Sequence, residues 1–163
     1  MAPGGAHPAM GTHNRLLSLG PSEYLEVIAI DPAAPRPARA RWFGLDGFSG
    51  PPRPVAWVLR CNNIDTEGWP EAAGPALALR RGDFAWRVTV PDSGLGPFDG
   101  LYPALIEWAA LHPTERLPDH GLRLAGLALS HPEITALAAS LPLHDARLHF
   151  AHGRAGLQLT LTT

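Results

Sequence analysis

The chain of 163 residues contains one cysteine, no lysine and no long apolar run. The single cysteine, Cys61, excludes an internal disulfide framework and a zinc site built on cysteines. No apolar run approaches the roughly 18 residues of a membrane-spanning helix, so no membrane partner is expected. All thirteen basic residues are arginines, and the formal net charge of −2 leaves no basic surface that would hold a nucleic acid.

The first ten residues, MAPGGAHPAM, lack the charged segment and the apolar segment of a secretion signal. A cytoplasmic protein is therefore expected. The apolar fraction of 45% and the length fit a single domain over residues 1–163. Glycine and proline, with 17 and 18 residues, exceed their usual share, which predicts short elements separated by turns instead of long helices.

The first third of the chain predicts a lead-in, a hairpin and a long connection. Residues 1–10 are interpreted as an extended lead-in, and 13–19 with 24–30 as a hairpin closed by a Gly-Pro turn. Residues 32–53 are rich in proline and form a connection that either packs over a pocket or links two halves. Residues 54–61, PVAWVLRC, predict a buried strand.

Two helices are predicted in the remainder. The first would begin with Asn63 or Asp65 as its cap and end at Gly74. The second follows a strand near residues 121–130, where Ser130 and Glu133 have the spacing of a capping box.

The other segments of the remainder predict strands. Residues 75–81 and 84–90 are strands, and the second alternates apolar and polar positions with period two. Residues 101–113 fit a strand or a short helix, and the chain is predicted to end in a hairpin around Gly153. This order of elements predicts an α+β fold with mainly antiparallel strands. It also indicates an internal repeat, because YLEVI and LIEWA place Glu26 and Glu107 at the same point of an apolar run.

Six segments resemble the glyoxalase-like domain proteins of the vicinal oxygen chelate superfamily: HPAMGTHNRLLSLG, YLEVIAIDP, RWFGLD, AWVLRCNNID, LIEW…HP and LRLAGLALSHPE. The resemblance covers nearly the whole chain. It implies βαβββ modules whose curved sheets enclose a pocket, which in this superfamily commonly holds a divalent metal ion. One ligand, usually His, comes from the first strand of each module, and another, usually Glu, comes from the last strand.

The resemblance divides the chain into a partial first module (1–31), the proline-rich connection (32–53), a second module (54–110) and a C-terminal strand, helix and hairpin (111–163). By the resemblance, this sequence is expected to start at about the second strand of module one, without the first strand, the helix and one metal ligand. In module two, Ala56 or Trp57 stands where a His ligand would be expected. A site without imidazole is a poor one for Zn²⁺, Ni²⁺ or Fe²⁺.

Glu26 is the main candidate for a catalytic residue, because by the resemblance it occupies the position of a metal ligand. A buried carboxylate needs a metal, an arginine or a retained proton. With Gly20 and Glu23 flanking the turn, Glu26 would face Leu17, and His13 would lie on the same face about 13 Å away. His13 is then a residue near the mouth of the pocket instead of a second metal ligand, and Asn14 forms hydrogen bonds beside it.

Three further residues are candidates for ligand binding, and each has a structural alternative. Glu107 is a second pocket carboxylate or a surface residue. Trp57 stacks on a ligand or packs in the core, and Arg87 holds a substrate carboxylate or faces solvent.

Two functions stay open for this sequence. One is metal-assisted lyase, isomerase or dioxygenase chemistry, with a divalent ion bound by Glu26 acting as a Lewis acid. The other is metal-free binding of a small molecule on the same scaffold. An unpaired strand edge would favour a homodimer.

Overall fold

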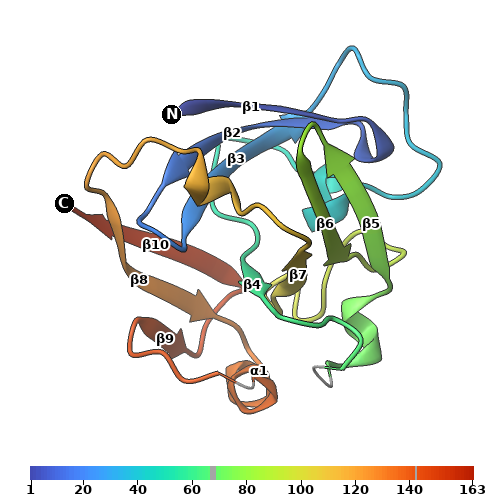
Figure 1. Cartoon of the computed structure of the whole chain (residues 1–163). Helices are drawn as coiled ribbons and strands as arrows, with labels where there is room; N and C mark the ends of the chain where they lie inside the picture. Colours follow the sequence, from blue (N-terminus) through green and yellow to red (C-terminus); the bar gives the residue numbers. More distant parts are fainter. Residues whose placement is uncertain (67–68, 142) are drawn as a thin grey trace.

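The computed structural model describes residues 1–66, 69–141 and 143–163, which form ten strands and one short α-helix (Figure 1). The helix is α1 (Ile134–Ser140). Four short 3-10 helices, η1 to η4, cover Pro8–Met10, Trp42–Gly47, Glu71–Ala73 and Pro113–Glu115. The strands are β1 (Ala2–His7), β2 (Thr12–Ser18), β3 (Tyr24–Ile30), β4 (Val58–Arg60), β5 (Ala76–Arg81), β6 (Phe84–Thr89), β7 (Ala104–Trp108), β8 (Arg123–Ser130), β9 (Leu148–Ala151) and β10 (Gly156–Thr162).

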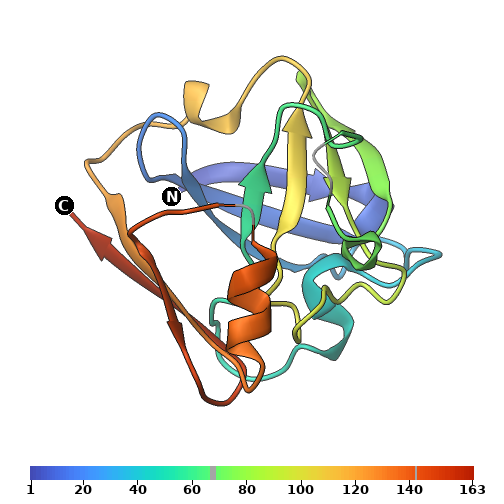
Figure 2. The ribbon, with the colours of Figure 1, turned by 90° about the horizontal axis from the view of Figure 1, so that it is seen from below.

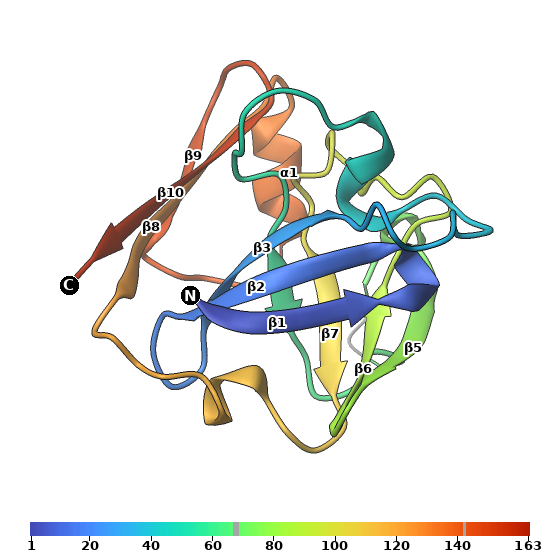
Figure 3. The same ribbon diagram turned by 90° about the horizontal axis from the view of Figure 1, so that it is seen from above.

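The strands form three sheets, with the orders β1-β2-β3, β4-β7-β6-β5 and β10-β8-β9. All pairs are antiparallel except β4 with β7 and β8 with β9. Figure 3 shows the first sheet lying across the strands of the second. The predicted α+β fold, with curved and mainly antiparallel sheets, is confirmed.

Alternation along the strands determines which side chains enter the core. In β2, Asn14 and Leu16 are buried while His13 and Arg15 are exposed. In β6, Trp86 and Val88 are buried, and they join Met10, Trp42, Leu45 and Val90 in a core against the second sheet. Trp42, Trp86 and Val88 of this core also form part of the wall of the candidate site.

A second core joins α1 to the third sheet. Ile134 and Leu137 of α1 pack against Leu127 and Leu129 of β8, together with Tyr102 from the second module. The helix thus lies between the third sheet and the rest of the molecule (Figure 2). None of the helices in the described part of the chain is long and apolar enough to cross a membrane.

The proline-rich connection is folded by a buried arginine, Arg41, whose Nε also donates to the carbonyl of Gly11 at 3.3 Å and so joins the connection to the first sheet. The Arg41 guanidinium donates a hydrogen bond of 2.6 Å to the carboxylate of Asp46, and its backbone N–H donates to the other oxygen at 2.8 Å. Between Arg41 and Asp46 the backbone turns through Phe43 and Gly44, which have φ values of 57° and 65°. This turn directs the rings of Trp42 and Phe43 inward.

Two of the predicted elements at the start of the chain and in module two are corrected. Residues 2–7 are not a lead-in but strand β1, which pairs with β2. The helix expected to end at Gly74 is only the short turn Glu71–Ala73; residues 67 and 68 of that prediction lie outside the described residues. Residues 101–113, whose sequence fits either a strand or a short helix, contain strand β7.

The C-terminal predictions are also corrected in two respects. Ser130 lies in β8 and donates to the backbone carbonyl of Arg154 at 2.7 Å, so it does not cap the helix, whose cap position is Glu133. The predicted terminal hairpin is wrong, because β9 and β10 flank β8 on opposite sides and do not pair with each other. The chain passes from β8 through α1 to β9, which pairs with β8 in parallel. Apolar runs in the sequence do not distinguish this arrangement from an antiparallel hairpin.

The outer edge of β3 has no strand partner among the described residues. In the second sheet the corresponding edge, that of β7, is covered by the parallel strand β4. Val27 and Ile30 of β3 are 48% and 40% exposed. The predicted homodimer would use an edge of this kind, and it stays a prediction.

The connection packs closely against Gly94, which has a φ of 75°. A Cβ atom added at this position would overlap the carbonyl oxygen of Arg41. Gly82 also has a positive φ, of 56°, but a Cβ there would meet nothing within 4 Å. We expect Gly82→Ala to lose about 1–2 kcal/mol of stability from the left-handed backbone alone. Gly94→Ala should lose at least twice as much in chemical denaturation; equal losses would show that the contact with Arg41 is not tight.

Candidate functional site

A cavity of about 480 Å³, a volume that includes its open mouth, lies between the first two sheets and the Trp42–Phe43 turn. The first sheet contributes a polar end and the second sheet contributes mostly apolar walls. The lining residues are His7, Asn14, Leu16, Tyr24, Glu26, Trp42, Phe43, Val58, Arg81, Trp86, Val88, Ile106, Trp108 and Pro113.

A second cavity, of about 380 Å³, shares Trp42 and Phe43 with the first. Its lining is largely glycine, proline and small apolar residues, and Tyr102 is its single ionisable side chain among the described residues. Acid, base and cationic groups are therefore concentrated in the first cavity.

The polar end of the first cavity is a chain of hydrogen bonds from Arg81 through Asn14 to Glu26. The Asn14 carbonyl oxygen accepts from Arg81 Nη1 and from the backbone N–H of Gly5, both at 2.9 Å. Since both partners are donors, the orientation of the amide is fixed. The Asn14 NH₂ group must then face Glu26, and it donates to Glu26 Oε1 at 2.8 Å.

Glu26 has a second carboxyl oxygen, Oε2, with no hydrogen-bond partner among the described residues. Burial raises the pKa of Glu26, while the hydrogen bond from Asn14 and the charge of Arg81 act in the opposite direction. The side chain keeps some exposed surface, but that surface faces a cavity enclosed by protein, so desolvation dominates. The raised pKa favours the protonated form, in which the carboxyl group both donates and accepts.

His7 is buried beside this chain and is held in one tautomer. Its Nε2 lies 3.1 Å from Arg81 Nη1 and 3.4 Å from Asn14 Nδ2, and both neighbours are donors. The proton is therefore assigned to Nδ1, which lies 3.1 Å from Thr12 Oγ1. Burial, with the charge of Arg81 second, lowers the pKa of His7 from 6.5 to about 4.

Aromatic side chains surround these polar groups. The His7 ring meets Trp42 and Trp86 edge to face, with ring centroids 5.0 and 6.1 Å apart. The indole N–H groups of Trp42 and Trp108 are buried and have no hydrogen-bond partner among the described residues. Burial, followed by the nearby Glu26, also raises the pKa of Tyr24. The polar groups of the first cavity thus lie among aromatic rings.

The structure brings together two of the predicted site residues, Asn14 and Glu26. The predicted register of the hairpin is wrong by one residue: Glu26 faces Leu16, and the last pair before the loop is Ser18 with Tyr24. A slip of one residue exchanges the two faces of a strand. Asn14 therefore lies on the face of Glu26, whereas His13 is exposed on the opposite face and does not line the cavity.

Trp57 lies away from Glu26. Its indole N–H donates to the carbonyl of Leu101 at 2.7 Å, and its ring packs against the core of the third sheet. The residue of β4 that lines the cavity is Val58. The strand position where a His ligand would be expected was therefore predicted one or two residues too early, at Ala56 or Trp57.

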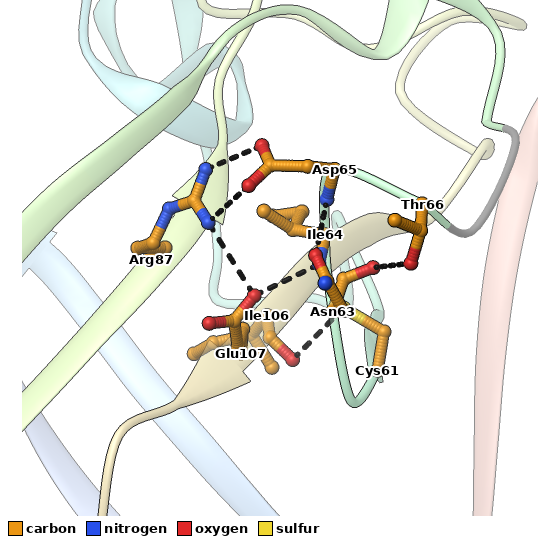
Figure 4. A network of polar contacts seen from close by, with 8 residues as sticks. All are labelled: Cys61, Asn63, Ile64, Asp65, Thr66, Arg87, Ile106 and Glu107. Atoms are coloured by element: carbon orange, nitrogen blue, oxygen red, sulfur yellow. Dashed lines mark hydrogen bonds and ion pairs between the residues drawn. The ribbon is translucent and has the colours of Figure 1, made fainter.

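Glu107 and Arg87 form a separate polar network on the other face of the second sheet (Figure 4). Arg87 makes two hydrogen bonds to Asp65, of 2.6 and 2.8 Å, and Glu107 accepts from the backbone N–H of Ile64 at 2.8 Å. These contacts hold the loop after β4 against the sheet. The expected equivalence of Glu26 and Glu107 is therefore wrong, because β7 turns Ile106 and Trp108 into the cavity instead.

Two polar lining residues, His7 and Arg81, were not predicted from the sequence. His7 ends a segment of glycine, alanine and proline that shows no periodicity. Arg81 could have been found, because it continues the alternation of Leu77 and Leu79, whose side chains are half-buried while Ala78 and Arg80 are exposed.

The residues around Glu26 do not supply the ligand set of a divalent metal centre. No group of three or more His, Cys, Asp or Glu suited to a metal ion occurs among the described residues. The nearest imidazole nitrogen, His7 Nε2, already accepts hydrogen bonds, and the cation Arg81 lies beside it. From β4 and β7 the cavity receives Val58 and Ile106, which have no donor atom for a metal. The metal ion at Glu26 stays a prediction that this donor set does not support.

Comparison with known proteins gives one match. A family model described as a glyoxalase-like domain matches residues 1–144 of the chain. No curated protein and no solved structure matches it.

The raised pKa of Glu26 predicts that its charge destabilises the fold. A carboxyl group with a raised pKa contributes most to stability below its unfolded pKa of about 4.3 and loses that contribution as pH rises through the folded value. Glu26→Gln should therefore raise the melting temperature at neutral pH, by roughly 2–4 °C for each 1 kcal/mol gained. The difference should shrink toward about pH 4.

The matched control for this variant is Glu71→Gln, since Glu71 is exposed at the surface. It should leave the melting temperature unchanged. A loss of stability in Glu26→Gln at neutral pH would contradict the burial of a carboxyl that favours its protonated form.

His7 should remain neutral well below the usual range for histidine. Its lowered pKa means that stability present above pH 6.5 is lost as pH falls toward about 4, because the unfolded chain takes up the proton first. NMR titration of the His7 ring should give a midpoint near 4. A midpoint near 6.5 would mean that the ring is accessible to water.

Proposed function

The chain belongs to the glyoxalase-like domain family, and we propose that its cavity binds a small molecule with a largely apolar body, without a metal ion as the anchor. The observation that carries this proposal is the position of Glu26. Its carboxyl group stands at the polar end of an aromatic cavity, and one of its oxygens has no hydrogen-bond partner among the residues that the structure describes.

The walls of the cavity favour an apolar ligand. Trp86 and Val88 from β6, and Ile106 and Trp108 from β7, supply one apolar surface, and the Trp42–Phe43 turn supplies a second. Most binding sites for small molecules combine apolar walls with a few fixed polar groups. This cavity has both, and its volume of about 480 Å³ includes the open mouth, so only part of it is enclosed.

The polar groups would fix the orientation of the ligand. Arg81 and Gly5 hold the Asn14 amide, and Asn14 holds Glu26, so the carboxyl is in place before a ligand arrives. A group that is already ordered loses little freedom on binding, which preserves affinity. A ligand that buries about 200 Å² of apolar surface gains roughly 5 kcal/mol, before the cost of association is subtracted.

The test is a ligand screen on the wild type and on Val58→Trp. Val58 is 40% exposed and lines the cavity, so an indole at this position would fill it. Small aromatic and aliphatic compounds should raise the melting temperature of the wild type and quench its tryptophan fluorescence. Both effects should be lost in Val58→Trp.

The matched control is Val27→Trp, because Val27 is also an exposed strand valine, at 48%, but does not line the cavity. It should bind as the wild type does. Unchanged binding in Val58→Trp would overturn the location of the site. Loss of binding on treatment with a chelator, restored by a divalent ion, would overturn the metal-free part of the proposal.

A further inference from the structure

We propose that the molecule bound in this cavity carries a carboxylate, which Arg81 recognises. This inference rests on the small-molecule binding proposed above and names the chemical class of the ligand.

The first argument is the charge of Arg81. In the part of the chain that the structure describes, no ion pair within 4 Å is found for Arg81, and it is the arginine among the residues that line this cavity. Its Nη1 contacts the neutral acceptors His7 Nε2 and Asn14 Oδ1, and its guanidinium carbon lies 5.9 Å from the centroid of the Phe84 ring. A guanidinium that lines a cavity without a carboxylate partner is suited to a bound anion.

The second argument is the number of hydrogen-bond donors that have no acceptor. Arg81 Nη2 and Nε form no hydrogen bond with any described residue. A carboxylate, with two oxygens that only accept, is the group that satisfies several donors at once.

The third argument is that Glu26 does not take the role of the missing anion. Its Oε1 accepts from Asn14, and no ion pair joins it to Arg81 within 4 Å in the described chain. Burial also favours its protonated form. In its protonated form, Glu26 donates from its second oxygen to the same bound carboxylate.

Affinity for matched compounds tests the inference. The panel contains phenylacetate, other aromatic and alkyl carboxylates, the corresponding neutral amides, and the cation phenethylamine. In the wild type, the carboxylates should bind more tightly than their amides, and the amine most weakly. Isothermal titration and tryptophan fluorescence provide the dissociation constants.

Arg81→Met should weaken binding of the carboxylates by about tenfold or more and change that of the amides by less than about twofold. Arg80→Met is the matched control, because Arg80 precedes Arg81 in β5 and is exposed; it should leave all affinities unchanged. Arg81→Lys, which keeps the charge but loses the planar set of donors, should fall between the wild type and Arg81→Met.

The outcomes separate this inference from the proposed function. Amides that bind as tightly as carboxylates, or an equal loss for both in Arg81→Met, would overturn the inference while leaving small-molecule binding intact. Failure of every carboxylate in the panel would overturn it as well. If Arg81→Met does not fold, the order of affinities in the wild type and the result for Arg81→Lys still decide between the outcomes.

Discussion

The amide of Asn14 links the two sheets that form the cavity, and the geometry of the site depends on it. Its oxygen accepts from Arg81 of the second sheet and from Gly5 of β1, and its nitrogen donates to Glu26 of β3. β1 can approach closely because Gly4 and Gly5 have no side chain: a Cβ at Gly4 would overlap Asn14 Oδ1, and one at Gly5 would lie 2.7 Å from Arg81 Cδ. The glycines at the start of the chain are therefore structural parts of the site.

The two sheets contribute to the cavity in different ways although both end in a strand with a glutamate. In β3 the glutamate faces inward and is held by Asn14, whereas in β7 it faces outward and fixes the loop around Ile64. The second sheet consequently presents Ile106 and Trp108 to the cavity. This asymmetry produces one polar end and one apolar wall, which is the arrangement expected for an orienting small-molecule site.

The sequence predicted the fold class and the alternating strand β6, because each depends on local pattern or on family motifs, while the catalytic role of Glu26 stays a prediction. It did not predict the register of the hairpin. The loop is longer than a Gly20–Glu23 turn, since Leu19 N–H donates to Glu23 O and the ladder begins only at Ser18 and Tyr24. This one-residue difference placed His13 on the wrong face. His7 was missed because its contacts are with residues that are distant in sequence, including Arg81.

Arg81 acts on the two titratable groups near it in the same direction but with different results. Its positive charge lowers the pKa of both His7 and Glu26. For His7 this adds to the effect of burial, so the ring stays neutral and accepts from the guanidinium. For Glu26 it opposes burial, which remains the larger effect. Neither His7 nor Glu26 forms an ion pair with Arg81 within 4 Å in the described chain, and the aromatic surroundings keep water from screening its charge fully. The electrostatics of the cavity are therefore governed by a single cation that comes from the second sheet and is held in place by the first.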